Sequence, residues 1–249
     1  MRPTRERYAA AVEADGRRLA EAASSGLDTP VPSCPGWTVA DVVRHTGVIH
    51  RHKERIVRER LLANPDRETP PDDAGLIAWF LEGVERLVAT LATTDPATEV
   101  VTFHPPDQSA GFWQRRMAHE TAIHRVDVEL AHHALTPLDP DIAADGVDEV
   151  LGPVRAAVAD DVSFGPDGRV VLMQTRDTGD IWHLVLGTGP NGFGWRWAEG
   201  GAADPVAVIT ATADVLDRWA WGRADEDEPA VEGDTGVVSA IRTAVARVT

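Results

Sequence analysis

Apolar residues in the first 160 positions follow the periodicity of helices. They recur at spacings of three and four in four stretches separated by loops, at residues 5–24, 38–62, 72–91 and 109–133. Thr38 is expected to cap the second stretch, because Asp41 three residues later comes close to a capping box. Four helices in this arrangement predict an antiparallel four-helix bundle. A further helix is predicted between Ile142 and Ala159.

The pattern changes near residue 163. Short apolar runs separated by turn residues predict strands at 169–173, 181–186, 193–197 and 205–210. Helices are predicted at 211–221 and 234–248. The chain is therefore expected to be a two-domain α+β protein. Residues 1–160 would form the helical bundle and residues 161–249 a small α+β domain.

Composition narrows the function classes. The 249 residues are 43% hydrophobic and carry a net charge of −16, with 24 basic and 40 acidic side chains, so binding to nucleic acid or to an anionic membrane is disfavoured. Cys34 is the single cysteine, which excludes an internal disulfide and a Cys-rich zinc motif. The charged N-terminal segment lacks the apolar core of a secretory signal. We expect a cytoplasmic protein that is a monomer or a weak dimer.

The fourth predicted helix contains the most informative polar pair. At 100° per residue, Glu120 and His124 fall inside the apolar arc that includes Trp113 and Met117. A carboxylate and an imidazole four residues apart, both facing a bundle interior, have the spacing that binds one metal ion. The opposite, solvated face is expected to hold Gln114, Thr121, Arg125 and Glu129.

Two structural alternatives remain open for this pair. Arg116 precedes Glu120 by four residues, so the two could form a buried salt bridge without a metal. His124 could be a core histidine that is hydrogen-bonded to Asp127 or to a carbonyl. A third ligand from another helix would favour the metal site.

The second predicted helix offers three histidines as that third ligand. His45 aligns at helical spacings with Val42 and Ile49, on the edge of the buried stripe. His52 lies seven residues later, about 10.5 Å along a helix, so the two cannot share one ion. His52 is flanked by charges and expected in solvent, and His50 is less well aligned. His45 is preferred, and completes a His–Glu–His set with open coordination positions, as in a catalytic zinc site.

These motifs together resemble a known family. Residues 31–41 (VPSCPGWTVAD), His45 and residues 119–127 (HETAIHRVD) resemble the actinobacterial mycothiol-dependent maleylpyruvate isomerase family. That family belongs to the DinB-like (YfiT-like) superfamily of metal-binding four-helix bundles. Its members carry a Pro-Gly-Trp-Thr element, a His eight residues after the Trp, and a His-Glu-x-x-x-His-Arg-x-Asp segment. The resemblance implies that His45, Glu120 and His124 bind the metal.

The resemblance extends into the second half of the chain. Residues 216–223 (LDRWAWGR) and 231–234 (VEGD) look like the family's second domain, which resembles a sterol-carrier-type α+β fold. Within it, Arg223 is the candidate catalytic residue, because a guanidinium could bind a carboxylate of the substrate or of the thiol. A surface arginine that ends a helix is the alternative interpretation. Cys34 is expected to be part of a structural turn.

The resemblance also implies an activity. Family members use a low-molecular-weight thiol, mycothiol, with a divalent metal, zinc, that stabilises the thiolate. The thiolate adds to a small-molecule electrophile, in a maleylpyruvate-type cis–trans isomerisation or in an S-transfer. Another thiol, such as bacillithiol or glutathione, remains possible on the sequence. The alternative function is a non-catalytic metal-binding or small-ligand-binding regulatory module with the same fold.

Overall fold

The computed structural model divides the chain into two compact units, Met1–Pro137 and Leu138–Thr249. It describes residues 2–154, 168–187, 195–197 and 204–246. The division falls earlier than the boundary near residue 160 that the sequence predicts. The reason is that the helix after Pro137 packs on a helix of the second unit, and the backbone N–H of Leu138 donates to Asp214 at 2.9 Å.

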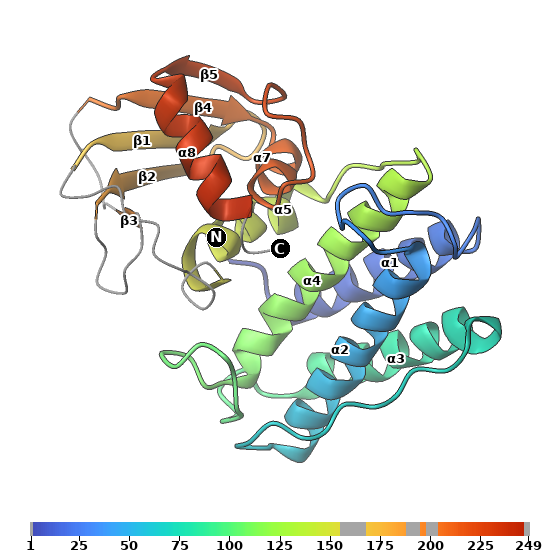
Figure 1. Ribbon diagram of the computed structural model, residues 1–249. Coiled ribbons are helices and arrows are strands. Elements are labelled where there is room, and N and C mark those ends of the chain that lie inside the picture. The colour runs from blue at the N-terminus through green and yellow to red at the C-terminus, as the bar shows by residue number, and fades with distance from the viewer. Residues whose placement is uncertain (1, 155–167, 188–194, 198–203, 247–249) are drawn as a thin grey trace. The chain divides into compact units, whose positions relative to one another are not determined.

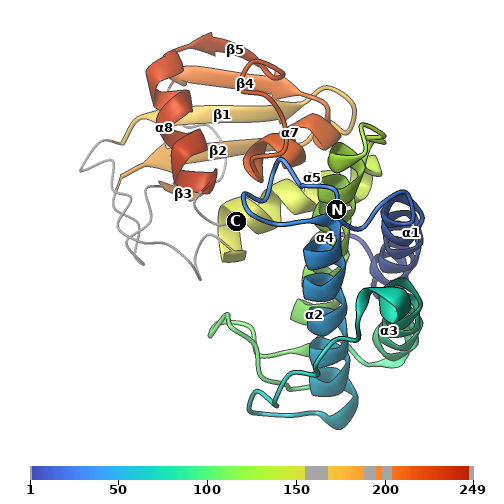
Figure 2. The ribbon, with the colours of Figure 1, turned by 45° about the vertical axis from the view of Figure 1, so that its right-hand side comes forward.

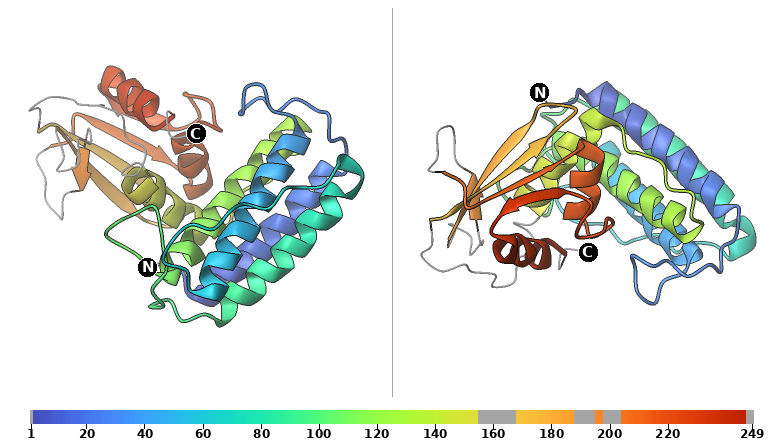
Figure 3. Two further views of the ribbon diagram at one scale, coloured as in Figure 1. Left: turned by 60° about the horizontal axis from the view of Figure 1, so that its bottom comes forward. Right: turned by 90° about the horizontal axis from the view of Figure 1, so that it is seen from above.

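The first unit is a four-helix bundle, as predicted (Figure 1). Its helices are α1 (Arg5–Ala23), α2 (Val39–Glu59), α3 (Asp73–Thr93) and α4 (Ala110–Ala131). Helix α4 packs against α1 and α2, and α3 packs against the same two helices (Figure 3). Thr38 caps α2 in a capping box, in which Asp41 accepts the Thr38 backbone N–H at 2.9 Å.

Helix α4 is buried on nearly all sides, which corrects the predicted solvent face. Gln114, Thr121, Arg125 and Glu129 are all buried. The prediction was wrong because neighbouring elements supply partners for these polar groups inside the protein. Thr121 lies 2.9 Å from Nε2 of His50 on α2, and Arg125 pairs with Asp15 on α1. Gln114 donates to the carbonyls of Leu91 and Thr94, at 3.1 and 2.9 Å. Satisfied in this way, polar groups can be buried at little net cost.

Gly47 of α2 packs directly against the ring of Trp79 on α3, and this contact supports a stability prediction. A Cβ on Gly47 would overlap the ring of Trp79. We expect Gly47→Ala to lower the free energy of unfolding by about 1–3 kcal/mol, because the packed helices must separate. Gly75→Ala is the control: the nearest atom to its new Cβ would be Cβ of Pro71, 3.9 Å away, so better helix propensity should leave stability unchanged or slightly higher. Urea denaturation followed by circular dichroism measures both, and an unaltered midpoint for Gly47→Ala would contradict the close packing.

The second unit contains a five-stranded mixed sheet in the order β3-β2-β1-β4-β5 (Figure 2). The strands are β1 (Val170–Thr175), β2 (Ile181–Leu186), β3 (Trp195–Trp197), β4 (Ala207–Ala211) and β5 (Ala230–Gly233). The central pair, β1 and β4, is parallel, and the other neighbours are antiparallel. The helices are α5 (Pro140–Glu149), with a π-helical turn at Val150–Val154, α7 (Ala213–Ala220) and α8 (Thr235–Ala246).

These elements confirm the two-domain α+β class, with two differences in detail. The predicted helix at 142–159 begins at Pro140. Its part beyond Val154 lies outside the described residues, and so do residues 193–194 of the third predicted strand. Strand β5 was missed because it is short and largely exposed, so pairing with β4 defines it rather than an apolar pattern. No helix in the described parts of the chain is long and apolar enough to cross a membrane.

Candidate metal centre

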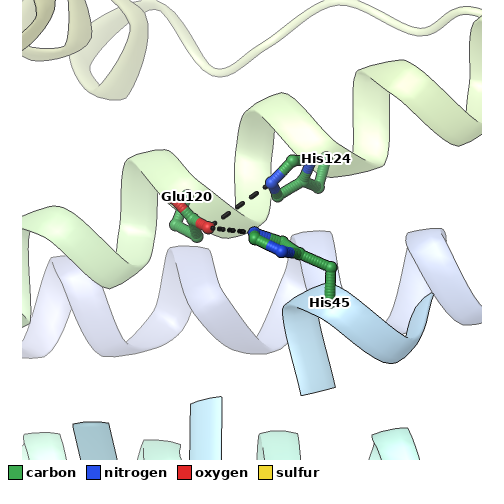
Figure 4. Close-up of side chains that lie close together, drawn as sticks. All are labelled: His45, Glu120 and His124. Atoms are coloured by element: carbon green, nitrogen blue, oxygen red, sulfur yellow. Dashed lines mark hydrogen bonds and ion pairs between the residues drawn. The ribbon is translucent and has the colours of Figure 1, made fainter. Parts of the chain in front are cut away.

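The structure brings His45, Glu120 and His124 together (Figure 4). Oε1 of Glu120 lies 3.2 Å from Nε2 of His45 and 3.4 Å from Nε2 of His124. The three potential ligand atoms all lie within 4.8 Å of one another. Among the residues that the structure describes, no other group of three His, Cys, Asp or Glu side chains converges in this way. The ligand set chosen from the sequence is therefore brought to one point.

Two helices supply the three side chains. Glu120 and His124 share one face of α4 because residues four apart are neighbours on a helix, and α2 supplies His45 from the facing helix. The His45 side chain is 35% exposed, against 13% for Glu120 and 12% for His124. The cluster is therefore closed on the α4 side and reachable from solvent beside His45.

Glu120 is held as a carboxylate by its surroundings. Burial alone would raise its pKa, but the Arg116 guanidinium and hydrogen bonds from His124 and His45 hold the pKa well below its usual range. Arg116 also forms a buried ion pair with the second oxygen of Glu120. The salt bridge that the sequence left as an alternative thus exists, and it uses a different oxygen from the one that faces the histidines.

The ring of His124 is oriented by a second carboxylate. Its Nδ1 lies 2.9 Å from Oδ2 of Asp127, which leaves Nε2 directed at Glu120. Burial lowers the pKa of His124, but hydrogen bonds to Asp127 and Glu120 outweigh it and raise the pKa to about 9. The second alternative, a histidine bonded to Asp127, is therefore also present. This bond is compatible with a ligand role, since histidines that bind metals commonly donate their other ring nitrogen to a carboxylate.

The other two histidines of α2 have structural partners. His50 is fully buried, its Nε2 lies 2.9 Å from the Thr121 hydroxyl, and burial lowers its pKa to about 3. His52 was expected in solvent, and that prediction was wrong. Its side chain is buried and its Nε2 lies 2.9 Å from the carbonyl of Pro65, because the segment that follows α2 returns along the helix.

Arg223 lies in the second unit, directly after α7. Only 6% of it is exposed, so it is not the surface arginine of the alternative interpretation. Its Nη1 donates to the carbonyl of Trp221 at 2.6 Å, and its own carbonyl accepts from Arg218 at 3.3 Å. A role for Arg223 in binding a carboxylate stays a prediction.

These features define a two-domain protein whose helical bundle carries a candidate metal centre and whose second domain is a small α+β unit. Residues 8–129 match the family described as "Mycothiol maleylpyruvate isomerase N-terminal domain", so the helical bundle belongs to that domain family. The resemblance stated from the sequence motifs is thereby confirmed.

Solved structures share the fold over most of the chain. A crystal structure of the mycothiol-dependent maleylpyruvate isomerase is 13% identical, with a TM-score of 0.63 over 92% of this chain and 93% of that chain. A structure of a histidine-to-alanine mutant of a mycothiol-dependent maleylpyruvate isomerase is 12% identical, with a TM-score of 0.62 and the same coverage. At such low identity the likeness establishes the common fold. No curated protein sequence matches the chain.

Proposed function

We propose that the chain is a metal-dependent enzyme that uses mycothiol to act on a small-molecule electrophile. The observation that carries this proposal is the convergence of His45, Glu120 and His124 within the domain that matches the isomerase family. Membership in that family supports mycothiol as the thiol, and the likeness to the solved isomerases supports an enzyme over a binding module.

The donor set fits zinc. Two imidazoles and one carboxylate are the protein ligands of many catalytic zinc sites, which keep a further position open. Bound there, the ion would stabilise the thiolate form of a thiol at neutral pH. Glu120 supplies a charged oxygen, Asp127 fixes the ring of His124, and the exposed edge of His45 leaves an approach for a small molecule.

Two outcomes can follow the attack of a thiolate on a conjugated carbon–carbon double bond. In isomerisation the sulfur adds to one carbon, the former double bond rotates as a single bond, and expulsion of the sulfur restores the double bond and the thiolate. The thiol is therefore not consumed. In S-transfer the carbon–sulfur bond is kept, and one thiol is used for each product molecule.

One assay separates these outcomes. Purified protein is incubated with mycothiol and maleylpyruvate, while absorbance follows the isomer and a thiol reagent follows free sulfhydryl. We expect isomer to form at constant thiol, and stoichiometric loss of thiol would indicate S-transfer instead. Glutathione and bacillithiol replace mycothiol in parallel reactions to test the choice of thiol. Tight metal binding without turnover of any electrophile would contradict the proposal and favour a regulatory module.

Arg223 is proposed to bind a carboxylate of the substrate or of the thiol. Because hydrogen bonds to charged groups contribute about 1.5–3 kcal/mol, Arg223→Ala should raise the KM for one of them roughly tenfold or more. Metal content and the circular dichroism spectrum should stay unchanged. Arg176→Ala, at an exposed arginine of the same unit, controls for the loss of one positive charge and should alter neither KM nor metal content. Unchanged kinetics in Arg223→Ala would show that another residue binds the carboxylate. Unfolding of the variant would show that Arg223 has a structural role.

A further inference from the structure

Asp127 joins the metal centre to a turn that is distant in sequence. The residue lies on α4 and is fully buried. Its Oδ2 accepts from Nδ1 of His124 at 2.9 Å, and its Oδ1 accepts from the Ser33 hydroxyl at 2.6 Å. The Cys34 thiol also donates to Oδ2, at 3.5 Å. One carboxylate therefore bonds both to a predicted metal ligand and to two residues that precede α2.

The turn that reaches Asp127 spans residues 30–38 and is closed on itself. Pro30 and Thr38 form an antiparallel bridge, and the backbone N–H of Val31 donates to the carbonyl of Trp37 at 2.9 Å. The ring of Trp37 lies against the ring of His45, with 5.2 Å between their centres. The 30–38 turn thus contacts one histidine of the cluster directly and the other through Asp127.

This arrangement has a physical consequence for the histidine. A buried carboxylate is costly unless donors surround it, and here Ser33 and Cys34 provide donors besides His124. A carboxylate fixed in this way holds the proton on Nδ1, so Nε2 is presented as a ligand with its ring orientation set. Without the Ser33 hydroxyl, the Asp127 carboxylate would lose a hydrogen-bond donor from outside α4, and its side chain would be held less firmly in this orientation.

We propose that Asp127 is the positioning residue of the metal centre and that the 30–38 turn, through Ser33, holds Asp127 in place. The inference rests on the proposed metal role of His45, Glu120 and His124. It adds a residue that need not touch metal or substrate, and it gives the turn before α2 a part in metal binding.

The test measures Zn²⁺ affinity of the full chain by competition with a chromophoric chelator. Asp127→Ala should weaken binding about 10- to 100-fold, the usual effect of removing such an outer partner. Asp127→Asn should recover part of the loss, because its amide oxygen still accepts from Nδ1–H. Ser33→Ala should weaken binding by a smaller factor. The visible spectrum of the Co²⁺-loaded protein should change in Asp127→Ala and return toward that of the wild type in Asp127→Asn.

Glu129→Gln is the matched control, since Glu129 is a buried carboxylate of the same helix that pairs with Arg125 instead of the cluster. It should lower thermal stability without altering Zn²⁺ affinity. If the wild type binds no Zn²⁺, the proposed metal centre itself fails. If the wild type binds and both Asp127 variants bind equally tightly, the positioning role is overturned. Equal weakening of Zn²⁺ affinity in Glu129→Gln and Asp127→Ala would also overturn the positioning role. If Asp127→Ala does not fold, the Zn²⁺ affinity of Asp127→Asn decides the question.

Discussion

Replacing His124 by alanine is expected to abolish metal retention, and with it thiol-dependent activity. Protein purified without chelators should contain about one equivalent of zinc by elemental analysis, and His124→Ala should contain almost none. The substitution removes one of three proposed ligands and leaves Glu120 and His45 on separate helices, where two donors hold an ion far less tightly. Near-stoichiometric zinc in the variant would refute the ligand assignment.

A histidine of the same helix provides the control for that experiment. His119 is buried next to Glu120, and its ring lies edge-on to Tyr8 at 6.2 Å instead of joining the cluster. His119→Ala should reduce the stability of the bundle and keep a full equivalent of zinc. Comparing the two variants therefore separates the loss of a ligand from the loss of a buried imidazole.

The ligand set could be proposed from the sequence because it depends on local geometry. Glu120 and His124 are neighbours on any helix, and the apolar positions around His45 place it at the edge of the buried stripe of α2, although His50 and His52 are more deeply buried. The start of α2 was also predictable, since Thr38 and Asp41 form their capping box within four residues. In each case the pattern lies within about two turns of one helix, although the contact between His45 and Glu120 joins positions 75 residues apart.

The features that the sequence could not predict depend on what packs against a residue from elsewhere in the chain. Periodicity assigns one buried face to a helix, whereas α4 contacts other helices on two sides, so its second polar face is internal. His52 is covered by a segment beyond the end of its helix. The hydrogen bond from Ser33 to Asp127 joins positions 94 residues apart. A single sequence contains no local pattern for such contacts.

A substitution at Arg125 tests directly whether this second polar face of α4 is internal. It is fully buried, and its guanidinium pairs with Asp15 of α1 at 3.1 Å and with Glu129 at 2.8 Å. Arg125→Met would fill similar volume but leave two carboxylates without this counter-charge, so we expect a loss of about 3–5 kcal/mol in the free energy of unfolding. At a solvated position the change would be within about 0.5 kcal/mol. Arg17→Met, at an exposed i,i+4 pair with Glu13, represents that case. Urea denaturation followed by helical circular dichroism measures both, and equal midpoints would show that Arg125 is not the centre of a buried ion-pair network.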